Sequence, residues 1–278
     1  MLGGGGVAGI AWETGVIVGL AEAGVDLGSA EVVVGTSAGS VAGALLRSGL
    51  SRAAWTAAVE EEPVESAALG ATPDAERFMT AVQQVLSSPA DSQEAARVRL
   101  GELALQVPAD RQAERVAVFE RLIGGTEWPE GRLLITAVDA ETGEFRTFDR
   151  DSGAPVATAV AASCAVPVVY PVVEIGGRRY MDGGMRSATN ADLVEGAARV
   201  VVLACSPEDP ANPLGPQLDA AVTMLKAAGA EVVVVVPDEA STAAFGTNSL
   251  ADSSRRPAAI AGHAQAAAEV DRIRTLWA

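Results

Sequence analysis

Residues 32–40 read VVVGTSAGS, in which a short apolar run leads into a serine enclosed by two glycines. The run is β-branched, which predicts a buried strand, and the VAGALL that follows predicts a helix. Gly35 and Gly39 would keep the neighbouring side chains minimal, as a tight turn between strand and helix requires. We interpret Ser37 as a candidate nucleophile at the positive end of a helix, and an ordinary strand-to-helix loop is the alternative.

A second glycine-rich stretch, GGGGVAG at residues 3–9, precedes this strand. A run of glycines leaves backbone N–H groups free to converge on one point. The functional interpretation is an oxyanion hole in which the N–H groups of Gly4, Gly5 and Gly6 face a tetrahedral intermediate, with Gly9 completing the motif. A flexible N-terminal tail is the structural alternative.

The glycine spacing also resembles two nucleotide-binding motifs. It fits the dinucleotide fingerprint Gly-x-Gly-x-x-Gly, but that motif expects an acid at the end of the second strand, where this chain runs straight into the Ser37 turn. A P-loop needs a lysine before Ser or Thr, and residues 3–9 contain no lysine. A nucleotide-binding protein therefore remains an alternative that rests on the glycines alone.

Asp182, Gly183 and Gly184 form a third motif, which follows the predicted hairpin EIGGRRYM. Asp-Gly is most often part of a simple β-turn. The other interpretation is a carboxylate at the end of a strand that points back toward Ser37. Taken alone, the motif favours the turn.

The chain contains a single histidine, His263. The order Ser37, Asp182, His263 is that of an α/β-hydrolase triad, but that fold places several strand–helix units before its nucleophile. Only 36 residues precede Ser37, which leaves room for about one such unit. His263 lies in the Ala-rich segment AIAGHAQAAAEVDRI, so we expect a surface or packed histidine on a helix and no catalytic role.

Composition and charge restrict the classes of function. The chain has 278 residues, 49% of them hydrophobic, which predicts a folded protein with a substantial core. A net charge of −16 argues against nucleic acid as a partner and allows at most peripheral contact with an anionic membrane. The two cysteines, Cys164 and Cys205, have the character of reduced core residues, and no cluster of metal ligands surrounds them. Without a signal peptide or a membrane-length apolar run, the expected location is the cytoplasm.

Three apolar runs indicate the architecture. The runs VVVG, RVVVLAC and EVVVVVP read as strands buried on both faces of a parallel sheet, and helical segments lie between them. These features predict a three-layer α/β/α sandwich with a mainly parallel central sheet. We expect a single domain over residues 1–278, in which residues 51–128 form a helical insertion over the active site.

Together, the glycine loop, the Ser37 turn and the Asp182 motif resemble the patatin-like phospholipase family. The likeness extends to ITAVDAETGEFRTFD and AVAASCAVPVVYPVVEIGGRRYMDGG, covers most of residues 2–205, and fades within 51–128 and after about 206. The resemblance implies a Ser-Asp dyad with Ser37 as nucleophile, Asp182 as general base and the glycine loop as oxyanion hole, without metal or organic cofactor. The implied activity is a serine acyl hydrolase acting on lipid or carboxylic esters.

Two departures from the family's pattern favour an alternative. The family often has Arg or Lys just before the last glycine of the loop, where this chain has Ala8. The family's first strand precedes the glycines, and here only Met1 and Leu2 do, so we expect the true start to lie upstream and the loop to be poorly held. The alternative is a catalytically weak relative that binds lipids or partner proteins.

Overall fold

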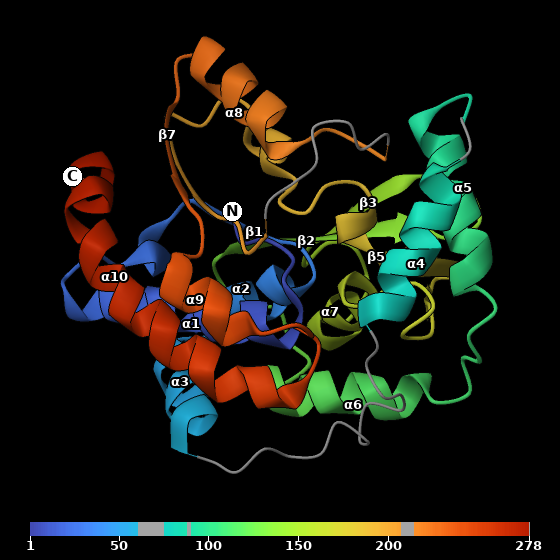
Figure 1. The fold of residues 1–278 in the computed structure, drawn as a ribbon, viewed down its shortest axis with the longest axis horizontal. Coiled ribbons are helices and arrows are strands. Elements are labelled where there is room, and N and C mark those ends of the chain that lie inside the picture. Colours follow the sequence, from blue (N-terminus) through green and yellow to red (C-terminus); the bar gives the residue numbers. More distant parts are fainter. Residues whose placement is uncertain (61–74, 88–89, 207–213, 278) are drawn as a thin grey trace.

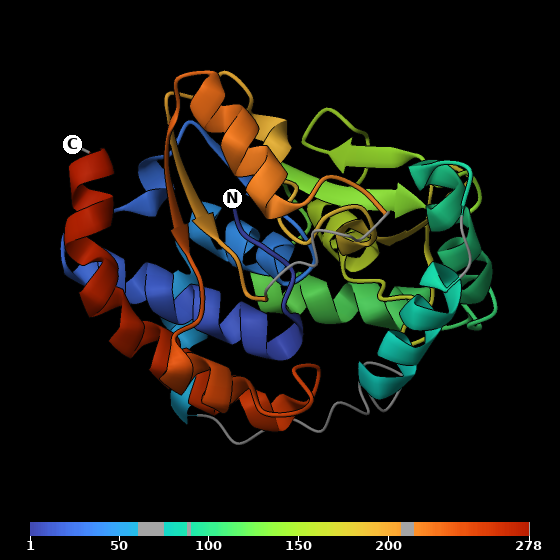
Figure 2. The same ribbon diagram turned by 45° about the horizontal axis from the view of Figure 1, so that its top comes forward.

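The computed structural model describes residues 1–60, 75–87, 90–206 and 214–277. The helices are α1 (Gly6–Glu22), α2 (Ala38–Arg47), α3 (Ser51–Glu60), α4 (Ala75–Leu86), α5 (Gln93–Ala104), α6 (Gln112–Ile123), α7 (Val156–Ser163), α8 (Leu218–Ala227), α9 (Glu239–Phe245) and α10 (Arg255–Trp277). The strands are β1 (Val32–Gly35), β2 (Arg132–Asp139), β3 (Phe145–Phe148), β4 (Val173–Ile175), β5 (Arg178–Asp182), β6 (Arg199–Leu203) and β7 (Glu231–Val235). Figures 1 and 2 show the sheet between two layers of helices.

The central sheet has a parallel half and an antiparallel half. β1 runs parallel to β2, and β6 runs parallel to β7. β3 and β5 both pair with β2 in the antiparallel sense, and β4 forms an antiparallel hairpin with β5. The prediction of a three-layer α/β/α sandwich is confirmed, and the sheet is mixed rather than purely parallel. The reason is local, because the tight turns at Gly143 and at Gly176–Gly177, where φ is positive, return the chain as hairpins.

Leu2 joins the two halves of the sheet. It makes parallel bridges to Gly35 on one side and to Leu203 on the other. Its N–H donates to the Val34 carbonyl at 2.8 Å, and its carbonyl accepts from the Thr36 N–H at 3.0 Å. The residues before the glycine loop therefore lie between β1 and β6 and anchor the loop directly to the sheet.

Strand register brings the ends of β1 and β5 together. Gly35, the last residue of β1, lies opposite Ile135 of β2, and Asp182, the last residue of β5, lies opposite Ala137. β3 pairs with residues 135–138 and so occupies the other edge of β2. Because β1 and β5 approach along the same edge from opposite directions, their ends meet with only Thr136 between them.

Alternation along β1 shows how the layers pack. Val33 belongs to the core beneath α1, α2, α7 and α10, whereas Val34 belongs to the core beneath α8 on the opposite face. Val138 lies on that second face as well, where α4 and α5 cover the far end of the sheet. The run EVVVVVP is less buried than predicted, because β7 is an edge strand and Val236 beyond it is 53% exposed.

Several elements differ from the sequence-based expectation. α7 and α9 were not predicted, and Val168, between α7 and β4, has φ +60. Residues 51–128 contain no strand in their described part and form α3 to α6, while residues 61–74 and 88–89 of this segment lie outside the described residues. No helix in the described part of the chain has the length and apolar character needed to cross a bilayer.

Candidate active site

Ser37 occupies a strained turn between β1 and α2. Its φ of +52 and ψ of −117 lie in a region that non-glycine residues rarely adopt, and α2 begins at the next residue. A Cβ on Gly35 would lie 2.4 Å from the Gly39 carbonyl oxygen, and a Cβ on Gly39 would lie 2.1 Å from the Leu2 carbonyl oxygen. Both flanking positions therefore exclude any side chain.

Neighbouring groups hold this strained turn in place. The Ser37 N–H donates to the Ser163 Oγ at 2.8 Å, so α7 supports the turn from the side. The Ser37 carbonyl accepts from the Ser40 hydroxyl at 2.7 Å and from the Cys164 thiol at 3.3 Å. Ser37 itself is 8% exposed, which leaves little water around its hydroxyl.

Asp182 is buried at the end of β5, where register places it beside the turn of Ser37 at the end of β1. Burial raises the pKa of Asp182 from 3.8 to about 7, against the opposing effects of the Ser37 hydrogen bond, the Gly184 N–H and the charge of Arg115. The Gly184 N–H donates to Oδ1 at 2.7 Å and so fixes the carboxyl group. A carboxyl group with this pKa can both accept and return a proton near neutral pH.

In the predicted oxyanion loop, some backbone N–H groups already donate hydrogen bonds within the protein and others do not. The Gly4 N–H donates to the Ala188 carbonyl at 2.8 Å, so this amide is not free to bind an oxyanion. Within the described residues, the N–H groups of Gly5 and Gly6 have no hydrogen-bond partner. Gly4 instead lets the loop lie close to Ser37, because a Cβ on Gly4 would lie 3.4 Å from the Cβ of Ser37.

The loop is tied down on the side that faces α1 and β6. The Gly3 N–H donates to the Glu13 carboxyl at 2.7 Å and to the Leu203 carbonyl at 3.0 Å. Gly39 in turn donates its N–H to the Gly3 carbonyl at 2.9 Å, which couples the loop to the start of α2. Ala8 is fully buried in α1. The loop is therefore well held in this structure, contrary to the sequence-based expectation.

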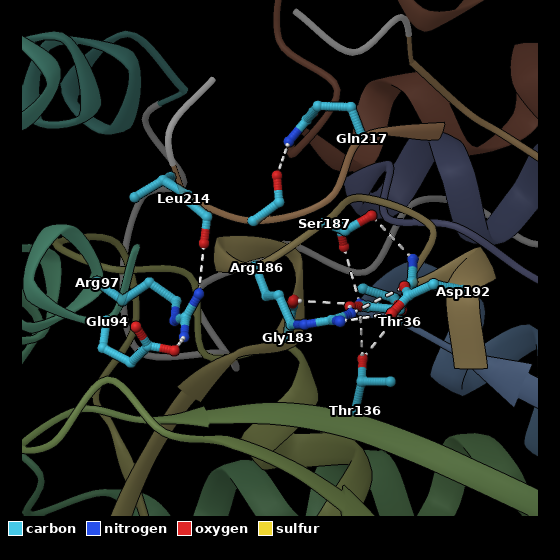
Figure 3. A network of polar contacts seen from close by, with 12 residues as sticks. Thr36, Glu94, Arg97, Thr136, Gly183, Arg186, Ser187, Asp192, Leu214 and Gln217 are labelled. Atoms are coloured by element: carbon cyan, nitrogen blue, oxygen red, sulfur yellow. Dashed lines mark hydrogen bonds and ion pairs between the residues drawn. The ribbon is translucent and has the colours of Figure 1, made fainter. Parts of the chain in front are cut away.

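Asn190 links the turn of Ser37 to the segment after Asp182, and sequence analysis did not identify it. Its side-chain amide donates to the Thr36 hydroxyl at 3.0 Å and to the Ser187 carbonyl at 2.8 Å. Thr136, in the gap between β1 and β5, donates to the same Thr36 hydroxyl at 2.9 Å. Figure 3 shows Thr36, Thr136 and Ser187 converging in this network.

His263 lies apart from the Ser37 turn. Its Nε2 is 2.8 Å from the Glu22 carboxylate, and its ring stacks on Trp55 with centroids 4.6 Å apart. The structure thus brings Ser37 and Asp182 together, but not His263. Cys164 and Cys205 are both buried and free, as predicted.

A cavity of about 580 Å³ opens beside Ser37. Its wall is mainly apolar and comes from α1, α3 and α6, with Gly6 of the loop also exposed to it. Four charged residues contribute as well, namely Arg115, Arg121, Asp252 and Arg255. A second cavity, of about 330 Å³, lies at the opposite ends of β1 and β6 and includes neither Ser37 nor Asp182.

Two comparisons with known proteins find similar chains. The profile of the family described as patatin-like phospholipase matches residues 1–194, a range that contains Ser37 and Asp182. Among solved structures, VipD from Legionella pneumophila is similar at 14% sequence identity and a TM-score of 0.47. That alignment covers 97% of this chain and 66% of the VipD chain, just under two thirds of its length. No curated protein matches the sequence.

Proposed function

Because the chain belongs to the patatin-like phospholipase family, we propose that it is a serine acyl hydrolase that cleaves lipid or carboxylic esters, with Ser37 as nucleophile and Asp182 as general base. The observation that carries the proposal is the position of a serine on a strained turn beside a buried carboxyl group with a pKa of about 7, where the ends of β1 and β5 meet. A carboxylate is ordinarily too weak a base for a serine hydroxyl. Burial raises the pKa of the carboxyl group and so reduces the difference in pKa between it and the hydroxyl.

The proposed reaction has two halves. Asp182 takes the Ser37 proton as Oγ attacks the ester carbonyl. The resulting oxyanion accepts hydrogen bonds from the N–H groups of Gly5 and Gly6. When the tetrahedral intermediate collapses, Asp182 returns the proton to the departing alcohol, which leaves an acyl group on Ser37. Asp182 then deprotonates a water molecule that attacks the acyl-enzyme. Asp182 passes this proton to Ser37 Oγ as the carboxylate product leaves.

The acyl chain would occupy the apolar cavity beside Ser37. Leu50 and Ala54 at α3 and Phe119 of α6 line it, so these helices would set the acceptable acyl chains. The proposal takes residues 1–278 as one domain, in which α3 and α6 of the segment 51–128 line the site. The mechanism uses only side chains and backbone groups of this chain.

The test is hydrolysis of p-nitrophenyl butyrate by purified variants. Ser37→Ala and Asp182→Asn should each reduce kcat/KM by about a thousandfold or more, the range seen when a catalytic group is removed. His263→Ala is the control and should keep most of the activity, because its side chain contacts Glu22 and Trp55 rather than the dyad. Wild-type rates in Ser37→Ala would contradict the proposal, and inactivity of His263→Ala would restore the triad.

Covalent labelling separates the enzyme from the weak binding protein. A fluorophosphonate probe should react with the wild-type protein on Ser37 and fail to react with Ser37→Ala. An unlabelled wild-type protein that still binds lipid would favour a binding role over catalysis.

A further inference from the structure

Glu13 is a buried acid in contact with the glycine loop. It lies on α1, is fully buried, and is the one carboxyl group among the buried residues of that helix. Its Oε1 accepts from the Gly3 N–H at 2.7 Å, and its Oε2 is buried without a hydrogen-bond partner in the described part of the chain. Side chains of an α-helix lean toward its N-terminus, so a carboxyl group two turns into α1 reaches back to the loop that precedes the helix.

The surroundings of Glu13 favour its uncharged form. Burial raises the pKa of its carboxyl group well above the usual value, against the smaller effects of the Gly3 N–H, Cys205 and the Met1 ammonium group. Cys205 and the Met1 ammonium group are the titratable groups that act on Glu13, and burial raises the pKa of that thiol as well. No Arg, Lys or His side chain in the described ranges forms an ion pair with Glu13. An unpaired Oε2 costs less free energy in the uncharged acid than in a carboxylate.

Cys205 supports the same loop from the end of β6. Its thiol donates to the Gly3 carbonyl at 3.8 Å. A Cβ on Gly5 would lie 2.4 Å from the Cβ of Cys205, so the loop passes directly over this side chain. Gly3 is thus held through its N–H by Glu13 and through its carbonyl by Cys205. This anchor lies two residues before Gly5, whose N–H has no partner within the described residues.

We propose that Glu13 is a positioning residue, which through Gly3 holds the glycine loop in the conformation that presents the oxyanion hole to Ser37. The uncharged acid is the form that does so. The proposal rests on the proposed acyl hydrolase function. An ionised Glu13 would place a negative charge next to the loop that has to stabilise an oxyanion, and this repulsion is strong in a buried site. The uncharged acid keeps the hydrogen bond to Gly3 without that charge.

The kinetic test compares Glu13→Gln with Glu13→Leu in the hydrolysis of p-nitrophenyl butyrate. Glutamine cannot ionise and keeps an oxygen that can accept from Gly3, so kcat should stay within about threefold of the wild-type value. Leucine removes the acceptor, so kcat should fall about tenfold or more while KM changes little, because the lost interaction acts in the transition state. Glu22→Leu is the matched control, since Glu22 ends the same helix and contacts Arg52 and His263 instead of the loop.

A stability measurement separates positioning from a merely structural role. In Glu13→Leu the Gly3 N–H still donates to the Leu203 carbonyl at 3.0 Å, and an apolar side chain replaces an incompletely paired acid. The melting temperature should therefore be no lower than that of the wild-type protein, while kcat falls. Wild-type kcat in Glu13→Leu would overturn the proposal. A folded Glu13→Gln as slow as Glu13→Leu would also overturn it, because the charge would then be required.

Amide hydrogen exchange needs no turnover and so separates this proposal from the proposed function. Exchange over residues 1–10 should be faster in Glu13→Leu than in the wild-type protein, and Glu13→Gln should match the wild-type protein. Unchanged exchange in Glu13→Leu would overturn the proposal whatever the activity of the protein. A wild-type protein without esterase activity would contradict the proposed function, and the exchange comparison would still decide whether Glu13 holds the loop.

Discussion

At the scale of single residues, one carboxyl group carries the acid–base chemistry proposed for this chain. Asp182 is 2% exposed and lies at the end of a strand, where Ser37, the Gly184 N–H and the charge of Arg115 favour its ionised form. Burial outweighs all three, which is why the pKa rises rather than falls. The same burial that makes the carboxylate a stronger base also keeps Asp182 protonated in a fraction of the molecules at neutral pH.

Activity should therefore depend on pH through Asp182. The pKa of about 7 belongs to the base in the free protein, and only its ionised form can accept the Ser37 proton. We expect kcat/KM for p-nitrophenyl butyrate to rise about tenfold per pH unit below pH 7 and to level off above it. A pH–rate profile that is flat from pH 5 to about 8 would rule out Asp182 as a base with a raised pKa.

The same shift makes a separate prediction for stability. Between pH 4 and 7 the folded protein keeps the Asp182 proton while the unfolded chain loses it, so this group contributes stability at low pH that is lost as the pH rises toward 7. The shift from 3.8 to about 7 corresponds to about 4 kcal/mol. Asp182→Asn should remove this dependence, which denaturant melts of wild type and variant at pH 4.5 and pH 8 would measure.

At the scale of elements, the structures that could be predicted from the sequence are those that residues close together in the chain determine. VVVG forms β1, the turn at Ser37 follows it, and α2 begins at once, because glycine spacing and β-branched residues act within a few positions. The hairpin β4–β5 was predicted for the same reason. Ser163, Asn190 and Arg115 were not identified as part of the site, because their partners lie 49 to 154 residues away and no local pattern records those contacts.

The start of α2 supplies a matched pair of substitutions. Gly39 and Gly43 lie one turn apart in this helix, and alanine normally stabilises a helix over glycine by about 1 kcal/mol. A Cβ on Gly39 would clash with the Leu2 backbone at 2.1 Å, whereas a Cβ on Gly43 would meet only side-chain atoms at 3.1 Å. Gly39→Ala should lower the melting temperature by several degrees, about 4 °C or more, and reduce esterase activity. Gly43→Ala should change both much less, and equal losses would show that contact with Leu2 does not position the turn.

At the scale of the whole molecule, charge is distributed unevenly between surface and cavity. The chain carries a net charge of −16, yet Arg115, Arg121 and Arg255 line the cavity beside Ser37, where Asp252 is the one acid among the described lining residues. This contrast follows from no one motif, because it depends on how distant segments fold around the site. The acidic surface therefore repels an anionic substrate at long range, even though the cavity itself carries more cations than acids among its described lining residues.

Long-range repulsion of this kind depends on salt. The screening length falls to about 10 Å at 0.1 M salt, which weakens repulsion across the exposed surface. Raising NaCl from about 20 mM to about 200 mM should therefore increase kcat/KM for an anionic ester, the p-nitrophenyl half-ester of succinic acid, and leave that for the neutral p-nitrophenyl butyrate unchanged. Both assays use the same protein, so the neutral ester controls for effects of salt on folding or catalysis. A decrease for the anionic ester would mean that exposed cations near the cavity, such as Arg121, dominate its capture.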